Sequence, residues 1–406
     1  MGTHVTSGFD KSAGRRFARA RPQGGHAQWA RHRDVPSESH PLRQHKKTPR
    51  EGRFRFCSWH TRRRMKRCLA TLVFAALCCA ACTPQPSSER IVGETMGTTY
   101  DVAVTRRPDG IRRSDLESTV DAVLADINRH LSTYDPSSEI SRFNANPGTD
   151  WIPVSAVLLD AVMQSAQVSL ATDGAFDITV GPIVQAWGFG SAAEVAADPP
   201  GNEQIERLRS AAGHDKLVAR VDAPALRKAV PALQIDVDGI APGIAVDRIA
   251  ERFEALEIRD YLVELGGEVR ARGLSPAGRA WRVAVEAPVA GERRPHALLE
   301  LDGFSVSTSG DYRDFREMAG HRVSHTIDPR TAAPVTHRLT SVTVVHASTA
   351  MADAYSTALM VLGPDEGMAA ARRLGLAALF IERPQGEGPF IESQTAGFAR
   401  FRRPLP

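Results

Sequence analysis

Apolar residues recur at helical spacing in several parts of the 406-residue chain. Positions three and four apart lie on one face of a helix, so this pattern predicts amphipathic or buried helices. The predicted helices span residues 116–131, 155–173, 202–213 and 351–362. Ser114 and Glu117 have the spacing of a capping box before the first helix. Gly363 and Pro364 are expected to end the last one.

Shorter runs rich in Val, Ile and Leu predict β-strands. They span residues 233–237, 261–265, 281–286, 297–301, 341–345 and 377–381. Predicted helices and strands are mixed along the chain, without an internal repeat and without a low-complexity linker after residue 90. We therefore expect one large α+β domain over residues 91–400, with a mixed β-sheet and flanking helices.

Charge is distributed unevenly along the chain. Residues 1–64 contain 16 Lys or Arg and 4 Asp or Glu, whereas the remainder contains 35 and 43. The body is therefore acidic, and the net charge of +4 is no indication of nucleic-acid binding. Residues 1–64 are expected to be a basic disordered extension or the product of a start codon called upstream of Met65. Every cysteine lies at or before Cys82, which excludes a disulfide framework or a cysteine metal site in the body.

Residues 65–82 resemble a bacterial export signal. A cluster of Arg and Lys precedes 13 uncharged residues, Leu69–Ala81, which are too few to span a bilayer. Small residues then precede Cys82, as at the lipidation site of lipoproteins, although Cys79 replaces the usual Leu. This pattern predicts a lipid anchor on Cys82, a tether over residues 83–90, and a protein facing the periplasm from the inner or outer membrane. Simple secretion and an uncleaved anchor are the alternatives.

Two segments combine acids, aromatics and glycines in a way that is common at binding sites. In residues 173–190, Phe176 and Trp187 offer flat surfaces and Asp177 offers a hydrogen-bond acceptor, while Gly and Pro restrict the backbone. Taken alone, this segment is typical of an ordinary helix-to-loop turn. In residues 235–247, a predicted strand ends in acids and glycines, which often places carboxylates and bare carbonyl groups at a site. A turn with solvated acids explains the second segment equally well.

A third group of residues carries the clearest chemistry. His325 places a titratable imidazole close in sequence to the carboxylate of Asp328, just before a turn. Asp353 and Thr357 are four residues apart on the apolar helix 351–362, so they share one face of it. Buried oxygens of this kind suit a hard cation such as Mg²⁺. The alternative is that Thr357 bonds to its own helix and Asp353 pairs with an arginine.

Together these segments resemble the FAD:protein FMN transferase family, also called ApbE. The resemblance covers about residues 91–383. It rests on an ordered series of motifs, whose number and spacing set it apart from a chance match. These motifs are Glu94–Thr99, Leu131–Tyr134, Ser138–Asn144, Asp173–Gly190, Asp236–Gly243, Leu265–Gly267, Ser309–Tyr312, Ser324–Pro329 and Met351–Gly363.

The resemblance implies an FAD-binding transferase with identifiable site residues. Met96 would pack on the nucleotide, and Tyr134 would stack on the isoalloxazine ring. The Mg²⁺ ligands would be Asp353, Thr357 and the backbone carbonyl of Gly239. The catalytic base would be the imidazole of His325. The full set of implied cofactor-binding residues is Met96, Tyr134, Ala175, Phe176, Asp177, Asp236 and Ile327.

The implied reaction is Mg²⁺-dependent transfer of FMN from FAD to a Thr or Ser hydroxyl of a target protein, with release of AMP. The implied acceptor is a membrane-associated redox subunit. One position departs from the family pattern: Pro242 stands where many members have a lysine that contacts the FAD phosphates, and proline removes both a charge and a backbone donor. A Mg²⁺-dependent FAD pyrophosphatase and a non-catalytic flavin-binding lipoprotein are the alternatives.

Overall fold

The computed structural model describes residues 88–190, 198–289, 291, 293–312, 315–318, 321–384 and 388–405. The predicted N-terminal extension, the export signal and Cys82 lie outside the described residues. Strand β1 (Glu89–Thr95) begins within the range predicted as a tether, so residues 89 and 90 belong to the sheet. None of the helices in the described ranges is both long and apolar enough to cross a membrane.

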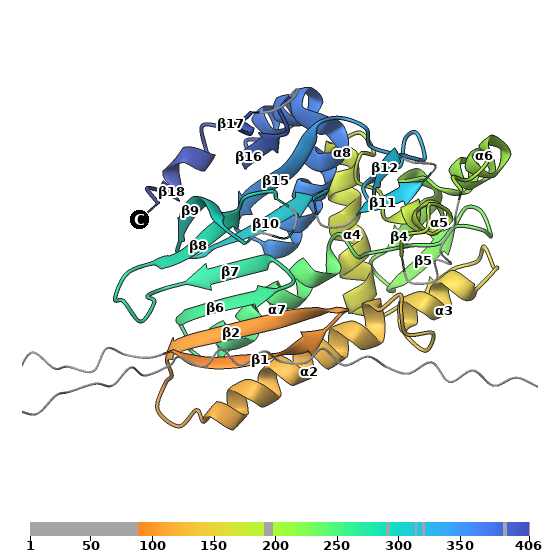
Figure 1. Cartoon of the computed structure of the whole chain (residues 1–406). Coiled ribbons are helices and arrows are strands. Elements are labelled where there is room, and N and C mark those ends of the chain that lie inside the picture. Colours follow the sequence, from red (N-terminus) through yellow and green to blue (C-terminus); the bar gives the residue numbers. More distant parts are fainter. Residues whose placement is uncertain are drawn as a thin grey trace, which may run out of the picture. The chain divides into compact units, whose positions relative to one another are not determined.

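An eight-stranded antiparallel sheet forms the centre of the domain (Figure 1). Its strands, in spatial order, are β1, β2 (Thr98–Arg106), β6 (Asp260–Leu265), β7 (Glu268–Arg272), β10 (Phe304–Gly310), β15 (Leu339–His346), β16 (Ala377–Glu382) and β17 (Ile391–Gln394). Every described pair in this sheet is antiparallel, where the sequence analysis expects mixed directions. The α+β class itself is confirmed.

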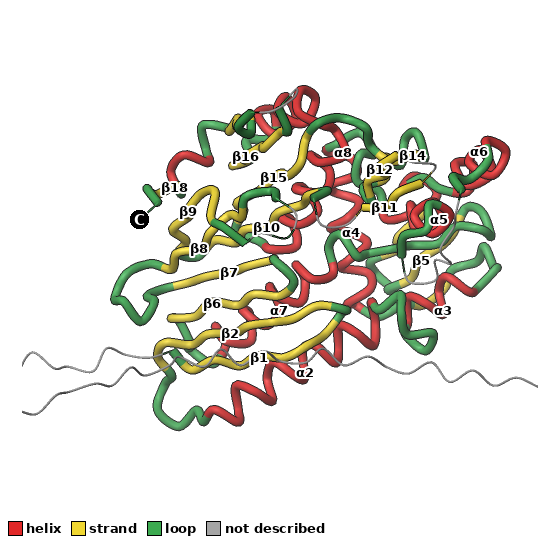
Figure 2. Tube along the Cα trace, in the orientation of Figure 1, coloured by secondary structure: helices red, strands yellow, loops and turns green. Residues whose placement is uncertain are grey.

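Smaller elements surround this sheet (Figure 2). The helices are α2 (Arg113–Leu131), α3 (Glu139–Ala145), α4 (Ala156–Ala171), α5 (Gly181–Ala186), α6 (Asn202–Ala211), α7 (Ala241–Ala255) and α8 (Thr349–Arg373). Two three-stranded sheets have the orders β18 (Arg402–Arg403), β9 (Pro295–Leu301), β8 (Trp281–Glu286) and β3 (Ile152–Pro153), β5 (Ala225–Lys228), β4 (Leu217–Arg220). The two remaining strand pairs are β11 (Phe315–Met318) with β12 (His321–Ser324) and β13 (Ile327–Asp328) with β14 (Ala333–Pro334).

The two faces of the large sheet belong to different hydrophobic cores. In β15, Val344 packs into the core formed with the helices, whereas its neighbour Val345 packs into the core that contains β8 and β9. This alternation follows from the two-residue period of side chains along a strand. Helices α7 and α8 both pack on the first face, which brings the starts of these two helices together.

The strand predicted over residues 233–237 is wrong, and this segment leads into the residues of the candidate site. Residues 233–237 are assigned no regular secondary structure and join no sheet. The side chain of Asn144 takes the place of a neighbouring strand: its Nδ2 donates to the Ile235 carbonyl and its Oδ1 accepts from the Ile235 N–H, both at 2.8 Å. The Asp236 N–H donates to the Ile178 carbonyl at 2.6 Å. Two distant segments therefore hold the backbone that leads into Asp236. The other five predicted strands are confirmed as β6, β8, β9, β15 and β16.

The predicted helices exist, with altered ends. The cap of helix α2 is Arg112, two residues before the predicted Ser114, and its first-turn acid is Asp115, which accepts from the Arg112 N–H at 2.8 Å. The predicted Ser114–Glu117 box does not form. A helix was predicted to start at Ser155, and Ser155 is the cap of α4; α6 is preceded by Gly201 as its cap. In α8, Gly363 has a left-handed φ of 78° that interrupts the helix, as predicted, but the chain resumes helical structure from Pro364 onward. Helices α3, α5 and α7 were not predicted.

Candidate functional site

A cavity of about 450 Å³ brings the distant chemical segments together. Ten of the eleven residues that the family resemblance singles out line it: Tyr134, Ala175, Phe176, Asp177, Asp236, Gly239, His325, Ile327, Asp353 and Thr357. The eleventh, Met96, lines an adjoining cavity of about 150 Å³. Tyr134 and Asp238 line both cavities. The two cavities therefore adjoin at these two residues.

The segment that leads into α7 meets α8 at one wall of this cavity. A Cβ added to Gly239 would lie 3.5 Å from Thr357 Oγ1 and 3.2 Å from Phe176 Cε2, so the backbone of Gly239 lies directly against α8. Asp353 is only 6% exposed, and its Oδ2 has no hydrogen-bond partner within the described part of the chain. An unsatisfied buried carboxylate oxygen is costly unless a ligand completes it.

The alternative to a metal site, in which Thr357 bonds to its own helix and Asp353 pairs with an arginine, does not occur. No arginine of the described segments pairs with Asp353. The Thr357 hydroxyl lies 3.2 Å from Ser309 Oγ on β10 and makes no recorded bond to its own helix. Two more hydroxyl contacts lie between β10 and its neighbours. Ser309 Oγ lies 2.7 Å from Ser356 Oγ of α8, and Ser307 Oγ donates to Glu268 Oε1 of β7 at 3.2 Å.

The cavity is strongly acidic. Among the described residues, its lining contains no Lys or Arg and five carboxyl side chains, which are those of Asp177, Asp236, Asp238, Glu268 and Asp353. Burial raises the pKa of Asp353 well above its ordinary value, and the negative charge of Glu268 adds to the effect. Burial also raises the pKa of Glu268 to about 7. The Asp238 residue is exposed, but partial burial of its carboxylate inside the cavity raises its pKa, and the negative charge of Asp236 adds to this effect. Together they bring the pKa of Asp238 to about 7. Such crowding of negative charge favours a bound cation.

The oxygen donors at this wall fit a hard divalent cation. Asp353 supplies a free carboxylate oxygen, Thr357 a hydroxyl and Gly239 a main-chain carbonyl, which are the ligand types that Mg²⁺ prefers. Over the described residues, no three His, Cys, Asp or Glu side chains are grouped closely enough to hold a metal ion by themselves. A site built here therefore depends on the hydroxyl, the carbonyl and oxygens of the substrate as well as Asp353.

These raised pKa values predict a pH dependence of stability in the metal-free protein. Folded Asp238 and Glu268 hold protons up to about pH 7, whereas the unfolded carboxyls release them near their ordinary pKa values of 3.8 and 4.5. Their stabilising contribution is full below the ordinary values and is lost as the pH rises through about 7. Urea unfolding in EDTA should therefore give a free energy of unfolding that falls from about pH 5 to about pH 8. Glu268→Gln should flatten this slope; an equal slope in both proteins would contradict the prediction.

Aromatic residues also line the site. Tyr134 is 63% exposed and lies where the two cavities join, so its ring is available for stacking. Phe189 also lines the cavity, and its ring lies 6.4 Å from that of His325 in an edge-to-face arrangement. Trp187, by contrast, is absent from the lining: its Nε1 donates to the Ala332 carbonyl at 2.9 Å within a small apolar core. The flat surface expected from Trp187 is thus supplied by Phe189.

Two of the acidic residues singled out in the sequence, Asp177 and Asp328, also stabilise the local structure. Asp177 Oδ1 accepts from the Thr179 N–H at 2.8 Å, and its Oδ2 accepts from the His214 N–H at 2.7 Å. Asp177 therefore stabilises the loop that it shares with Phe176 while it lines the cavity. The carboxylate of Asp328 binds the guanidinium of Arg330 in a bidentate pair, with Nη2–Oδ2 at 2.8 Å. Asp328 is therefore already engaged by a neighbouring charge.

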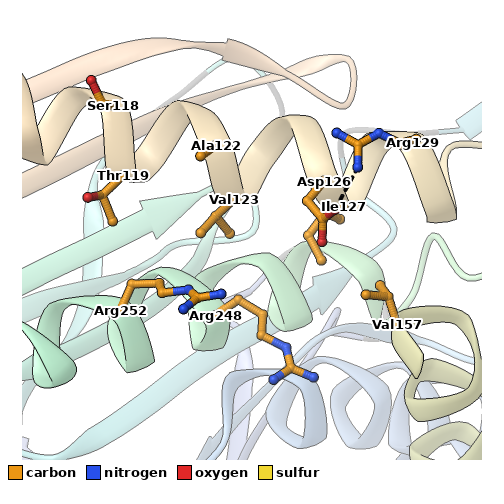
Figure 3. A pocket seen from close by; sticks show the side chains of 10 residues that line it. All are labelled: Ser118, Thr119, Ala122, Val123, Asp126, Ile127, Arg129, Val157, Arg248 and Arg252. Atoms are coloured by element: carbon orange, nitrogen blue, oxygen red, sulfur yellow. Dashed lines mark hydrogen bonds and ion pairs between the residues drawn. The ribbon is translucent and has the colours of Figure 1, made fainter. Parts of the chain in front are cut away.

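A second large cavity, of about 520 Å³, lies between α2 and α7. Figure 3 shows side chains of the two helices across it, including Arg248 and Arg252 of α7. None of the residues predicted for the flavin or metal site lines this cavity. Arg248 also pairs with Asp160 at 2.8 Å. The chemistry described above therefore belongs to the acidic cavity of about 450 Å³.

The fold and the site identify the class of protein. The chain belongs to the ApbE family, whose model matches residues 96–380. A relative from Haemophilus influenzae named FAD:protein FMN transferase is 36% identical over 336 residues, which is 81% of this chain and 96% of the relative. The Escherichia coli K12 protein of the same name is 36% identical over 77% of this chain and 91% of its own length.

Solved structures give the same assignment. The flavinyl transferase ApbE of Pseudomonas stutzeri, in its apo form, is 42% identical and superposes with a TM-score of 0.70, covering 78% of this chain and 96% of that one. The flavin transferase ApbE of Vibrio cholerae is 35% identical with a TM-score of 0.72, covering 78% and 99%. The predicted family and fold are thereby confirmed.

Proposed function

We infer that this member of the ApbE family is an FAD:protein FMN transferase, and we propose that it works with Mg²⁺ and releases AMP. The observation that carries the Mg²⁺ proposal is the free buried oxygen of Asp353, which lies in the same cavity as Thr357, Gly239 and His325. The curated relatives named FAD:protein FMN transferase support the reaction class. Stacking on Tyr134 would orient the isoalloxazine ring at the junction of the two cavities.

Breaking the pyrophosphate bond of FAD spreads negative charge over phosphoryl oxygens. A bound Mg²⁺ supplies neutralisation of that charge and a fixed orientation of the phosphates. Asp353, Thr357 and the carbonyl of Gly239 would hold the ion. Among the described residues, the lining of this cavity includes no Lys or Arg, so its ionised acids would repel a dinucleotide that arrived without a cation.

The remaining chemical requirement is activation of the acceptor hydroxyl. A Thr or Ser hydroxyl attacks efficiently only when a base removes its proton during the reaction. His325 lines the cavity between β12 and β13, and an imidazole accepts protons around neutral pH. We assign this base role to His325. Asp353 would be engaged in holding the cation.

The location and the partner are part of the same proposal. The signal over residues 65–82 and Cys82 support an exported lipoprotein anchored to the inner or outer membrane and facing the periplasm. A membrane-associated redox subunit exposed on the same side would then be the acceptor. The test of this location is metabolic labelling with a fatty acid, which should mark the wild-type chain and leave a Cys82→Ala variant unlabelled.

The function is tested by incubating the chain from residue 83 with FAD, Mg²⁺ and a peptide that carries the family's acceptor motif. A peptide that gains the mass of FMN, with an equal amount of AMP, establishes the transferase. AMP with free FMN and an unmodified peptide would favour the pyrophosphatase. Bound FAD without any AMP would leave the non-catalytic flavin-binding lipoprotein.

Pro242 provides a further prediction. It is the second residue of α7 and lines the cavity of about 150 Å³ beside Tyr134 and Asp238. The described lining of that cavity includes no cationic side chain. Pro242→Lys would add a positive charge and a backbone donor at a helix N-terminus. We expect the KM for FAD to fall by about tenfold, equivalent to about 1.4 kcal/mol, with a smaller change in kcat. Pro242→Ala, which restores only the donor, separates the two effects; an unchanged KM in the lysine variant would contradict the prediction.

A further inference from the structure

Helices α7 and α8 are in close contact where both begin. A Cβ added to Gly243 would come within 2.7 Å of the Ala350 Cα, so only glycine fits at this crossing. Four residues earlier, Gly239 lies against Thr357 of α8. Four residues later, Asp247 reaches the first turn of α8. One side of the segment 239–247 therefore contacts α8 along three successive turns.

The carboxylate of Asp247 accepts four hydrogen bonds from the start of α8. Its Oδ1 accepts from the Thr349 N–H at 2.9 Å and from Thr349 Oγ1 at 2.8 Å. Its Oδ2 accepts from Ser348 Oγ at 2.7 Å and from the Ala350 N–H at 3.1 Å. Arg270 Nη1 lies 3.3 Å from Oδ1 and completes the cluster. These contacts satisfy backbone donors that have no partner inside the helix, and they place a negative charge at the positive end of α8.

The contact is aligned with the residues proposed to hold Mg²⁺. Thr349, Asp353 and Thr357 are four residues apart, so they share one face of α8. Asp247 therefore holds the turn directly before the two ligands. The third ligand, the carbonyl of Gly239, lies on the segment that leads into α7, the helix that carries Asp247. One carboxylate thus links the two elements whose oxygens must converge on a single ion.

We propose that Asp247 is a positioning residue of the Mg²⁺ site, an inference that rests on the proposed function. It sets the axial position and rotation of α8 relative to Gly239. Asp247 does not line the catalytic cavity; it lines a separate polar cavity of about 340 Å³ together with Asp160. Mg²⁺ requires near-octahedral geometry with ligands at about 2.1 Å, so a small displacement of α8 weakens binding.

The test compares Asp247→Asn with Asp160→Asn in the full chain. The amide of the first variant would place N–H groups against donors of α8, whereas Asp160 pairs with Arg248 of α7 and makes no recorded hydrogen bond or ion pair with α8. Titration calorimetry with Mg²⁺ in the presence of FAD should show a Kd raised at least about 10-fold in Asp247→Asn and unchanged in Asp160→Asn. FAD binding in EDTA should stay within about twofold of the wild type in both variants. The Mg²⁺ concentration that half-saturates transfer should rise in parallel with Kd.

A double variant distinguishes positioning from simple helix stability. Asp247→Asn with Ser348→Asp restores a negative charge at the start of α8 without restoring the link to α7. We expect the melting temperature to recover while the Kd for Mg²⁺ stays high. Recovery of both together would overturn the proposal. If Asp247→Asn fails to fold, Thr349→Val removes one of the four bonds and should raise Kd by about threefold.

The wild type separates failure of this inference from failure of the proposed function. Wild-type protein that binds Mg²⁺ and an Asp247→Asn variant that binds it equally well would overturn the positioning role alone. Wild-type protein that transfers FMN without binding Mg²⁺ would overturn the metal site and the positioning role with it. Loss of FAD binding in Asp247→Asn would show a general collapse of the site and would also overturn the proposal.

Discussion

Asp353→Asn is expected to lower FMN transfer at least about 10³-fold and to stabilise the metal-free protein at the same time. The two effects have one cause. Asp353 is 6% exposed, its Oδ2 has no partner in the described structure, and burial together with the charge of Glu268 raises its pKa. The carboxylate is therefore unfavourable for folding until a cation binds it. An amide of the same shape removes the charge that destabilises the fold and also the ligand that the cation requires.

The measurement pairs a transfer assay with thermal unfolding at about pH 8 in EDTA, where the wild-type carboxylate is most unfavourable. The variant should melt at a higher temperature than the wild type and gain less from added Mg²⁺. Thr357→Ser keeps a hydroxyl and serves as the matched control, whereas Thr357→Val should behave like Asp353→Asn in the assay. Full wild-type activity in EDTA would reject the metal site. A variant that is both inactive and less stable would show that Asp353 acts through the fold.

Local sequence pattern predicted those parts of the fold that depend on nearest neighbours. The alternating apolar residues of β15 face the two cores, as at Val344 and Val345, so the strand could be located before its partners were known. Residues 233–237 carry a similar pattern, but their backbone partners are Asn144 and Ile178, which are distant in sequence. Helix α7 escaped prediction because its first residues, Ala241 to Gly243, have the composition of a turn.

The candidate site also combines residues that the sequence predicted with contacts that depend on distant segments. Motif resemblance named His325, Asp353 and Thr357 one by one, and the fold brings them to one cavity. Glu268 was missed, although it directly follows the Leu265–Gly267 motif. Its importance arises from the approach of β7 to β10 and α8, which places its carboxylate beside Ser307 and near Asp353. No pattern within a single segment encodes such an encounter between three elements.

His325→Ala is expected to lower FMN transfer by about 10²–10⁴-fold while FAD still binds, because general-base catalysis contributes about that much. The imidazole lies at the cavity wall beside Phe189, and the oxygen donors proposed for Mg²⁺ come from other elements, so the substitution should leave the metal site intact. The measurement is single-turnover transfer to an acceptor peptide, with FAD affinity determined separately. His321→Ala, at the exposed start of β12 and four residues before His325, is the matched control.

Two further readouts separate a base from a residue that only shapes the pocket. Added imidazole should partly restore transfer in His325→Ala, since a diffusible base can enter the space that the side chain leaves. If His325 acts on the acceptor hydroxyl, slow release of AMP from FAD by water should persist in the variant even where transfer is lost. Equal loss of transfer, hydrolysis and FAD affinity would instead assign His325 to the architecture of the cavity, and unchanged turnover would remove it from the mechanism.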